Sequence, residues 1–179
     1  MIKKIIIVVV VAVIGYFGYG FMTHRSHSPL TSVEGNLGEL SVSVDYCQPS
    51  KKGRLIFGEE SEDALVPNGQ YWRLGANDAT EITFNKDVNF AGKNVAAGRY
   101  RFYAVPDATQ WELSLNSQIG EFGFFEPDYT LDVVKVNVPV QSNSEELELF
   151  TMTFDSDSTG LQLNMAWDQT LVSVPISQQ

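Results

Sequence analysis

Histidine and cysteine are almost missing from this chain of 179 residues. Its two histidines, His24 and His27, lie beside an apolar N-terminal stretch, so residues 28–179 contain none. The lack of imidazole excludes Ser-His-Asp and Cys-His nucleophiles and His-ligated metals from the main part of the chain. Cys47 is the only cysteine, which excludes an internal disulfide, a Cys-x-x-Cys redox pair and a cysteine-rich zinc site. We therefore expect no catalytic residue of these kinds, no metal and no cofactor.

Positive charge is also scarce. The chain has 12 basic and 22 acidic residues, and Lys3, Lys4 and Arg25 flank the N-terminal apolar stretch. Without these three, nine basic residues face 22 acidic ones in residues 26–179, a net charge of −13. Such a surface repels nucleic-acid phosphates and anionic lipid headgroups, so we expect no nucleic-acid partner.

Charged residues are absent from Ile5 to Met22, a run of 18 residues. A helix of this length is about 27 Å long, close to the thickness of the bilayer hydrocarbon core. Lys3 and Lys4 on its N-terminal side predict a cytoplasmic N-terminus. We therefore expect residues 1–25 to form a membrane anchor, with the membrane as a partner through residues 5–22. The rest would be the exported part of a single-pass inner-membrane protein, in the periplasm or outside the cell.

A cleaved signal peptide is the alternative for the same segment. Its apolar region is normally about 7–15 residues long and ends at a small-x-small site. The run here is longer, and Gly18-Tyr19-Gly20 is a poor cleavage site. Both interpretations place the remaining chain outside the cytoplasm, but cleavage would make it a secreted protein.

Alternation of apolar and polar residues with a period of two recurs along the rest of the chain, and no segment after residue 25 has three uninterrupted turns of helical periodicity. Such alternation is typical of antiparallel strands with one buried and one solvated face. Turn residues separate the runs, which are Leu40–Tyr46, Thr80–Phe84, Tyr100–Ala104, Trp111–Leu115, Val134–Val138, Leu147–Thr151, Leu161–Trp167 and Val172–Val174.

About nine such strands predict an all-β fold, an antiparallel β-sandwich of jelly-roll type over residues 37–179. Residues 26–36 would be a tether and residues 139–146 a polar loop within the domain. In the Tyr100–Ala104 run, the alternation assigns Arg101 and Tyr103 to the solvated face.

The segment around Trp72 and Arg73 is the strongest candidate for a ligand site. An indole face and a guanidinium with five donors suit carboxylates, phosphates or sugar hydroxyls. Positive charge also concentrates in residues 51–54, and the two segments would form an electropositive pocket if their loops converge. The tentative ligand-binding set is Lys52, Arg54, Trp72, Arg73, Asn77 and Thr80. The alternative is structural: the arginines would hydrogen-bond loop carbonyls, and Trp72 would close one end of the sandwich.

Two acidic segments have simpler interpretations. Residues 59–63 contain four acids and predict a solvated loop tip rather than a cation site. Residues 155–160 match the first half of a calcium loop, but its twelfth position is Ala166, where a bidentate Glu is needed. We expect a hairpin turn there.

The order of motifs from residue 46 to residue 176 resembles a bacterial exported family, domain of unknown function 2911. The resemblance rests on Lys52-Gly53-Arg54-x-Ile56-Phe57-Gly58, Leu65-Val66-Pro67-x-Gly69, Trp72-Arg73-x-Gly75-Ala76-Asn77-x-Ala79-Thr80-x-Ile82-x-Phe84, Gly92-Lys93, Ala97-Gly98-x-Tyr100, Pro106, Trp111 and Val172-Ser173-Val174-Pro175. It implies a β-sandwich in exported proteins without an established activity. It also implies that the family keeps Arg54, Trp72, Arg73, Asn77 and Thr80, as a pocket or as a brace. The chain departs from the pattern by an insertion at Glu59–Asp63, by the lack of a tryptophan in Ile119–Phe124 and by its anchor-like N-terminus.

These observations favour a non-catalytic binding or accessory module at the membrane surface, with a small molecule or a glycan as its ligand. A carboxylate-dependent hydrolase acting on glycans is the alternative, and it requires two acids about 5–10 Å apart in a cleft at Arg73. A subunit of a membrane protein assembly, packed through the glycines of the anchor, is a third hypothesis.

Overall fold

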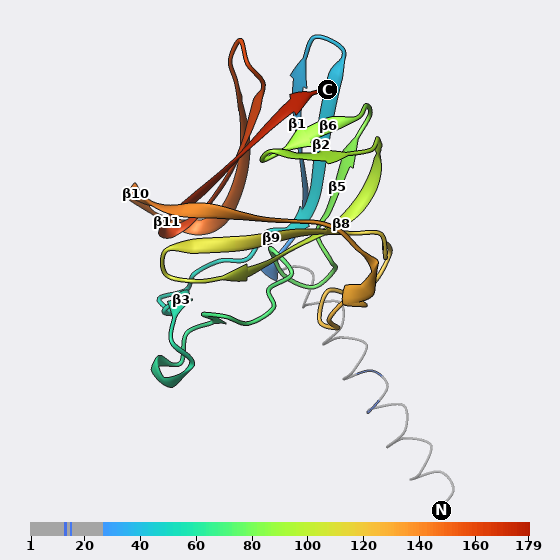
Figure 1. Cartoon of the computed structure of the whole chain (residues 1–179). Coiled ribbons are helices and arrows are strands. Elements are labelled where there is room, and N and C mark those ends of the chain that lie inside the picture. The colour runs from blue at the N-terminus through green and yellow to red at the C-terminus, as the bar shows by residue number, and fades with distance from the viewer. Residues whose placement is uncertain (1–12, 14, 16–26) are drawn as a thin grey trace, which may run out of the picture.

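The computed structural model describes residues 13, 15 and 27–179 of the chain (Figure 1). The predicted anchor, residues 1–25, lies outside the described residues except for positions 13 and 15. None of the helices formed by the described residues has the length and apolar character needed to cross a membrane.

Residues 27–179 form a mostly antiparallel all-β domain, which confirms the all-β part of the predicted fold class. Two short 3-10 helices, η1 (Glu60–Glu62) and η2 (Tyr129–Leu131), interrupt the strands. The strands are β1 (Leu30–Leu37), β2 (Leu40–Cys47), β3 (Phe57–Gly58), β4 (Val66–Pro67), β5 (Glu81–Phe84), β6 (Val88–Phe90), β7 (Lys93–Val95), β8 (Gly98–Pro106), β9 (Gln110–Asn116), β10 (Asp132–Ser156) and β11 (Leu161–Gln178).

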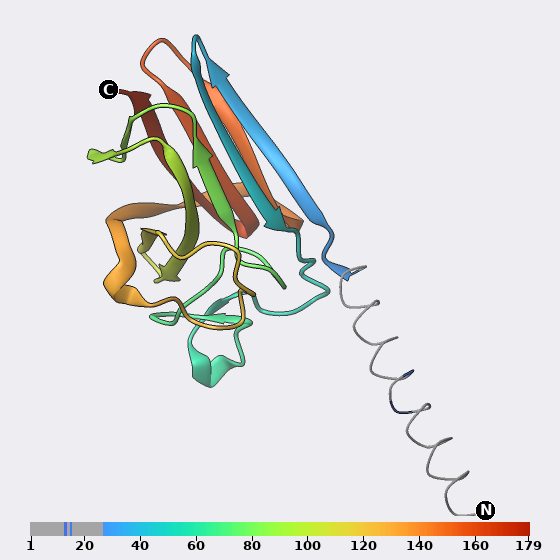
Figure 2. The same cartoon turned by 90° about the vertical axis from the view of Figure 1, so that its right-hand side faces the viewer.

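Nine of these strands form one sheet in the order β1-β2-β5-β8-β9-β10-β11-β6-β7, while β3 and β4 form a separate short parallel pair. The long strand β10 joins two halves of this sheet. One half contains β1, β2, β5, β8 and β9, and the other contains β11, β6 and β7. Its residues 132–139 pair with β9, and its residues 140–156 pair with β11. Figure 1 shows β10 running along β9 before it turns upward into the hairpin with β11, and Figure 2 shows the same sheet turned by 90°.

One hydrophobic core joins the two halves of the sheet. Inward residues of most of the predicted strands supply it, because one face of each strand packs away from water. The face predicted for the Leu147–Thr151 run was wrong, since Phe150 is 0% exposed while Leu149 is 42% exposed, and the bulges in this part of β10 shift the alternation. Its largest members include Trp111 on β9, Trp167 on β11, Phe84 on β5 and Phe90 on β6, all nearly fully buried. Phe90 contacts Phe84 edge-on with ring centroids 6.1 Å apart, which links the two halves directly.

The tether predicted for residues 26–36 was wrong from residue 30 onward. β1 pairs with β2 over its whole length, from Leu30 opposite Cys47 to Leu37 opposite Leu40. β1 lies at the edge of the sheet and most of its side chains are at least partly exposed. An edge strand of this kind needs no apolar alternation, so its polar composition did not indicate a strand.

The polar loop predicted for residues 139–146 was also wrong, because this segment is the middle of β10. The register with β11 shifts between Ser142 and Leu147 and again between Leu147 and Thr151, so the strand is bulged here. Bulges bend a strand without ending it, and the side chains of this segment are mostly exposed. Polar residues are therefore compatible with pairing.

The solvated face predicted for Arg101 and Tyr103 was wrong as well, since these side chains are 1% and 0% exposed. The connection between β9 and β10, here called the 117–131 loop, covers this face of β8. The hydroxyl of Tyr103 donates to Asp132 Oδ2 at 2.8 Å, directly after the loop. Alternation in sequence cannot reveal a loop that closes over the outer face of a sheet.

Candidate functional site

The segment that carries Trp72 and Arg73 is fixed on the edge of β8. The backbone N–H of Trp72 donates to Ala104 O at 2.8 Å, and the N–H of Ala104 donates back to Trp72 O at 2.9 Å. The indole of Trp72 is 6% exposed and packs among aromatic rings, including Trp167 at 6.0 Å and Phe150 at 4.9 Å between centroids. Trp72 therefore positions its neighbour Arg73 from a rigid, buried base.

A tight loop follows Arg73. Leu74, Gly75 and Asn77 all have positive φ, of 53°, 154° and 54°. A Cβ at Gly75 would lie 2.7 Å from the carbonyl oxygen of Cys47, which already accepts a hydrogen bond from Ala76 N at 3.1 Å. Only glycine fits this close approach of two backbones.

Asn77 and Thr80 stabilise this loop rather than face the solvent. The fully buried hydroxyl of Thr80 donates to Leu74 O at 2.8 Å. The side-chain amide of Asn77 donates to Ser28 O at 3.3 Å, and the backbone carbonyl of Asn77 accepts from Gly123 N at 3.0 Å. Their hydrogen bonds tie the loop to the start of β1 and to the 117–131 loop.

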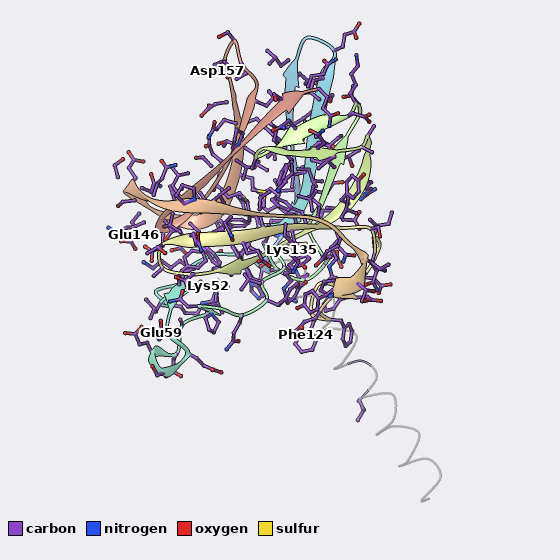
Figure 3. All side chains as sticks on the ribbon, viewed as in Figure 1. Lys52, Glu59, Phe124, Lys135, Glu146 and Asp157 are labelled. Carbon is purple, nitrogen blue, oxygen red and sulfur yellow. The ribbon has the colours of Figure 1, made fainter. Side chains whose placement is uncertain are left out.

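The basic segment at residues 51–54 lies over the bulged part of β10. Lys51 Nζ pairs with Glu146 Oε1 at 2.7 Å and with Asp168 Oδ1 at 2.8 Å, and these hydrogen bonds raise the pKa of its ammonium group. Because two acids balance Lys51, it adds no uncompensated charge. Lys52 is exposed, and its backbone N–H donates to Glu148 Oε1 at 2.8 Å. Figure 3 labels Lys52 and Glu146 on this side of the molecule.

Arg54 turns back over the same segment. Its Nε donates to Lys51 O at 3.0 Å and its Nη2 donates to Ser50 O at 2.6 Å. These two bonds fix the plane of the guanidinium, while the side chain stays exposed at the surface.

Arg54, Trp72 and Arg73 line one cavity of about 190 Å³ together with Trp167. The structure thus brings three of the six sequence-predicted site residues together, while Lys52, Asn77 and Thr80 are not among the lining residues. None of the described residues that line this cavity is acidic. The two arginines therefore give it a positive potential on a strongly acidic body.

Arg73 is the more unusual of the two arginines. Within the described part of the chain, its guanidinium has neither a hydrogen bond nor an ion pair. Burial lowers the pKa of Arg73, and the positive charge of Arg101 lowers it further, although the group remains charged at neutral pH. A partly buried charge without a counter-ion is costly, and an anion in the cavity would offset that cost.

Arg101 lies beside Arg73 and was missed by the sequence interpretation. Its Nη2 donates to the hydroxyl of Tyr71 at 2.5 Å and to the carbonyl of Phe125, and its Nε has no hydrogen-bond partner among the described residues. The Tyr71 hydroxyl donates in turn to Gly123 O at 3.0 Å. Burial raises the pKa of Tyr71, so this hydroxyl stays protonated. No local sequence signal marks Arg101, because the loop that buries it lies more than fifteen residues further along the chain.

Acidic side chains gather in a separate cleft of about 600 Å³, which includes Asp45, Asp78, Glu81 and Glu121. The carboxylate of Glu81 accepts from Gly120 N at 2.6 Å and pairs with Arg99. Among the described residues, no group of three or more His, Cys, Asp or Glu side chains is arranged to hold a metal ion.

The Asp155–Gly160 segment forms the hairpin turn between β10 and β11, as predicted. Asp157 Oδ1 accepts hydrogen bonds from the backbone of Thr159 at 2.6 Å and of Gly160 at 3.2 Å. A hydrogen bond from the Thr159 hydroxyl lowers the pKa of Asp157 most, and the two backbone hydrogen bonds lower it further.

The fold and the cavity define the class of protein: an antiparallel all-β domain with an arginine-lined, acid-free cavity. The family model described as "Protein of unknown function (DUF2911)" matches residues 28–176, and the chain therefore belongs to this family, as the motifs indicated. Searches of the curated proteins and of the solved structures found no match to this chain.

Proposed function

We propose that this protein is a non-catalytic binding module, and that the cavity between Arg54 and Arg73 takes a small ligand with a carboxylate or phosphate group. The observation that carries this proposal is the pair of guanidinium groups on a cavity without acidic lining residues. A planar guanidinium binds such oxyanions through two parallel hydrogen bonds, and no residue that the structure describes accepts a hydrogen bond from the guanidinium of Arg73.

The two arginines would have different roles in binding the ligand. Arg54 is fixed by the carbonyls of Ser50 and Lys51, so it contributes a positioned charge at the mouth of the cavity. Arg73 rests on the buried Trp72 and is the main hydrogen-bond donor. A cavity of about 190 Å³ suits one small group, such as a uronic acid at the end of a glycan or a single phosphate.

A glycan hydrolase gains no support from this cavity, since no acid lines it. The acids of the second cleft line a separate space, and Glu81 among them is already paired with Arg99. A role as a subunit of a membrane assembly is compatible with ligand binding and stays a separate hypothesis.

Isothermal titration calorimetry of the full chain with glucuronate and with inorganic phosphate tests the ligand site. We expect binding of at least one of them, and at least a tenfold loss of affinity in Arg73→Gln, since a charge-assisted hydrogen bond contributes about 1.5–3 kcal/mol. Lys93→Gln on β7 is the matched control, because it removes the same unit charge from an exposed site. No binding by the wild type at millimolar concentrations, or equal affinity in the two variants, would contradict the proposal.

We further propose that the N-terminal segment is an uncleaved anchor, that the domain lies on the outer side of the inner membrane, and that the bent sheet is a sandwich of jelly-roll type. The support for the anchor is the uncharged run from Ile5 to Met22, with Lys3 and Lys4 before it. Alkaline carbonate extraction with intact-mass measurement tests it. A soluble mature form that begins near residue 21 or residue 29 would refute the anchor in favour of a signal peptide.

A further inference from the structure

Large apolar side chains are exposed in and around the 117–131 loop. Phe124 and Phe125 are 69% and 65% exposed, and Phe122 and Ile119 are each 46% exposed. Soluble monomers seldom expose several large apolar residues side by side without an interaction partner. Phe124 and Phe125 contact each other edge to face, with ring centroids 5.6 Å apart, so they form one apolar projection.

The backbone beneath this projection is held in place. The N–H of Gly123 donates to Asn77 O at 3.0 Å, and the carbonyls of Gly123 and Phe125 accept from Tyr71 and Arg101. A Cβ at Gly123 would lie 2.6 Å from Cδ of Arg73, so the loop packs directly on Arg73. The rings point outward because the polar backbone of the loop occupies the inner side.

The projection lies at the end of the domain where β1 begins. Leu30, the first residue of β1 and 68% exposed, lines the same cleft as Ile119 and Phe122. Figure 3 shows Phe124 at the lower end of the domain, whereas Asp157 in the β10–β11 hairpin lies at the upper end. Both Figure 1 and Figure 2 place the start of β1 below the β10–β11 hairpin.

Chain length then limits how far this end can lie from a bilayer. The uncharged run ends at Met22, and the chain is fixed again at Pro29, whose carbonyl accepts from Gln48 N at 2.9 Å. Seven residue steps span at most about 25 Å when fully extended. If residues 5–22 cross the membrane, Pro29 therefore lies within about 25 Å of the membrane surface. The apolar projection lies at this same end of the domain, since Leu30 shares a cleft with Ile119 and Phe122.

We infer that the 117–131 loop docks on the bilayer, with Phe124 and Phe125 inserted at the level of the headgroups. This inference rests on the proposed membrane anchor but not on the ligand site. The contact is apolar rather than electrostatic, because Glu121, Glu126 and Asp128 flank the rings. It therefore favours zwitterionic lipid, and anionic lipid weakens it. Docking also orients the domain, and it places the loop that covers Arg73 and Arg101 at the lipid interface.

Fluorescence quenching in phosphatidylcholine nanodiscs tests this inference with the full chain. Phe124→Trp is compared with Asp157→Trp, which places the same reporter at the opposite end of the domain, and the wild-type emission from three buried tryptophans is subtracted. Lipids brominated on the acyl chain near the headgroup should quench Trp at position 124 about two-fold or more, since interfacial rings lie roughly 5–10 Å deep. Trp at position 157 should not be quenched.

The other outcomes overturn the inference in distinguishable ways. If the chain elutes without the nanodiscs, both the anchor and the docking fail, while the calorimetric test of the ligand site is unaffected. If the chain elutes with the discs but Trp at positions 124 and 157 is quenched equally, the docking alone fails. If two chains occupy each disc by light scattering and Trp at position 124 shifts to the blue without quenching, a second copy covers the loop instead of lipid. Replacing Phe125 by Trp gives an independent second reporter.

Discussion

Adding a single methyl group at Gly75 should destabilise the loop that follows Arg73. In Gly75→Ala the new Cβ would lie 2.7 Å from the carbonyl oxygen of Cys47, and φ is 154°, where side chains are strained. Backbone strain of this kind costs about 1–3 kcal/mol. The oxygen belongs to the end of β2 and cannot move without breaking its bond from Ala76. We therefore expect a total destabilisation of roughly 2–4 kcal/mol.

Urea denaturation followed by tryptophan fluorescence measures this loss, because all three tryptophans are buried. In thermal denaturation, a chain of this size should lose roughly 2–4 °C in Tm per kcal/mol of destabilisation, so the Tm of Gly75→Ala should fall by about 4–16 °C. Gly38→Ala is the matched control: its φ is +61°, but no atom lies within 4 Å of the added Cβ, so it bears only the backbone strain of about 1–2 kcal/mol. If the two variants unfold with the same free energy, the close approach at Gly75 does not constrain this loop.

Two further predictions concern single contacts elsewhere in the domain. Tyr46→Phe removes the buried hydroxyl that accepts a hydrogen bond from Met152 N at 3.1 Å. The N–H left unpaired should lower the free energy of unfolding, measured by urea denaturation, by about 1–3 kcal/mol. A loss too small to resolve would show that this N–H finds another partner. The lowered pKa of Asp157 means that its ionised form stabilises the hairpin above the usual pKa of 3.8, and that this stability is lost as the pH falls through the lower folded-state pKa. The urea midpoint of Asp157→Asn, which cannot titrate, should therefore fall less than that of the wild type between about pH 6 and about pH 3, and equal slopes would contradict this assignment.

Strands whose inner side chains are buried and whose outer ones are solvated could be predicted from the sequence. β2 is the clearest case: Leu40, Val42 and Val44 are fully buried and the residues between them are partly exposed. β1 and the middle of β10 could not be predicted, because most of their side chains remain exposed and no burial imposes alternation on them. The prediction for the outer face of β8 was wrong for the opposite reason, since a loop distant in sequence buries Arg101.

The candidate site could be predicted only in its local part. Trp72 and Arg73 are adjacent and of unusual types, and Arg54 stands in a short basic run, so composition alone indicated them. Trp167 and Arg101 come from β11 and β8, and they reach the site only through the order of strands in the sheet. No pattern within one strand carries that information.

The strand β10, which both halves of the sheet share, has a consequence for how the protein unfolds. Its first third completes the pairing of β9, and the remainder completes the pairing of β11. Separating the chain near Pro139 would leave each fragment with an unpaired strand edge and only part of the common aromatic core. The domain should thus melt as a single cooperative unit, and neither fragment should fold by itself.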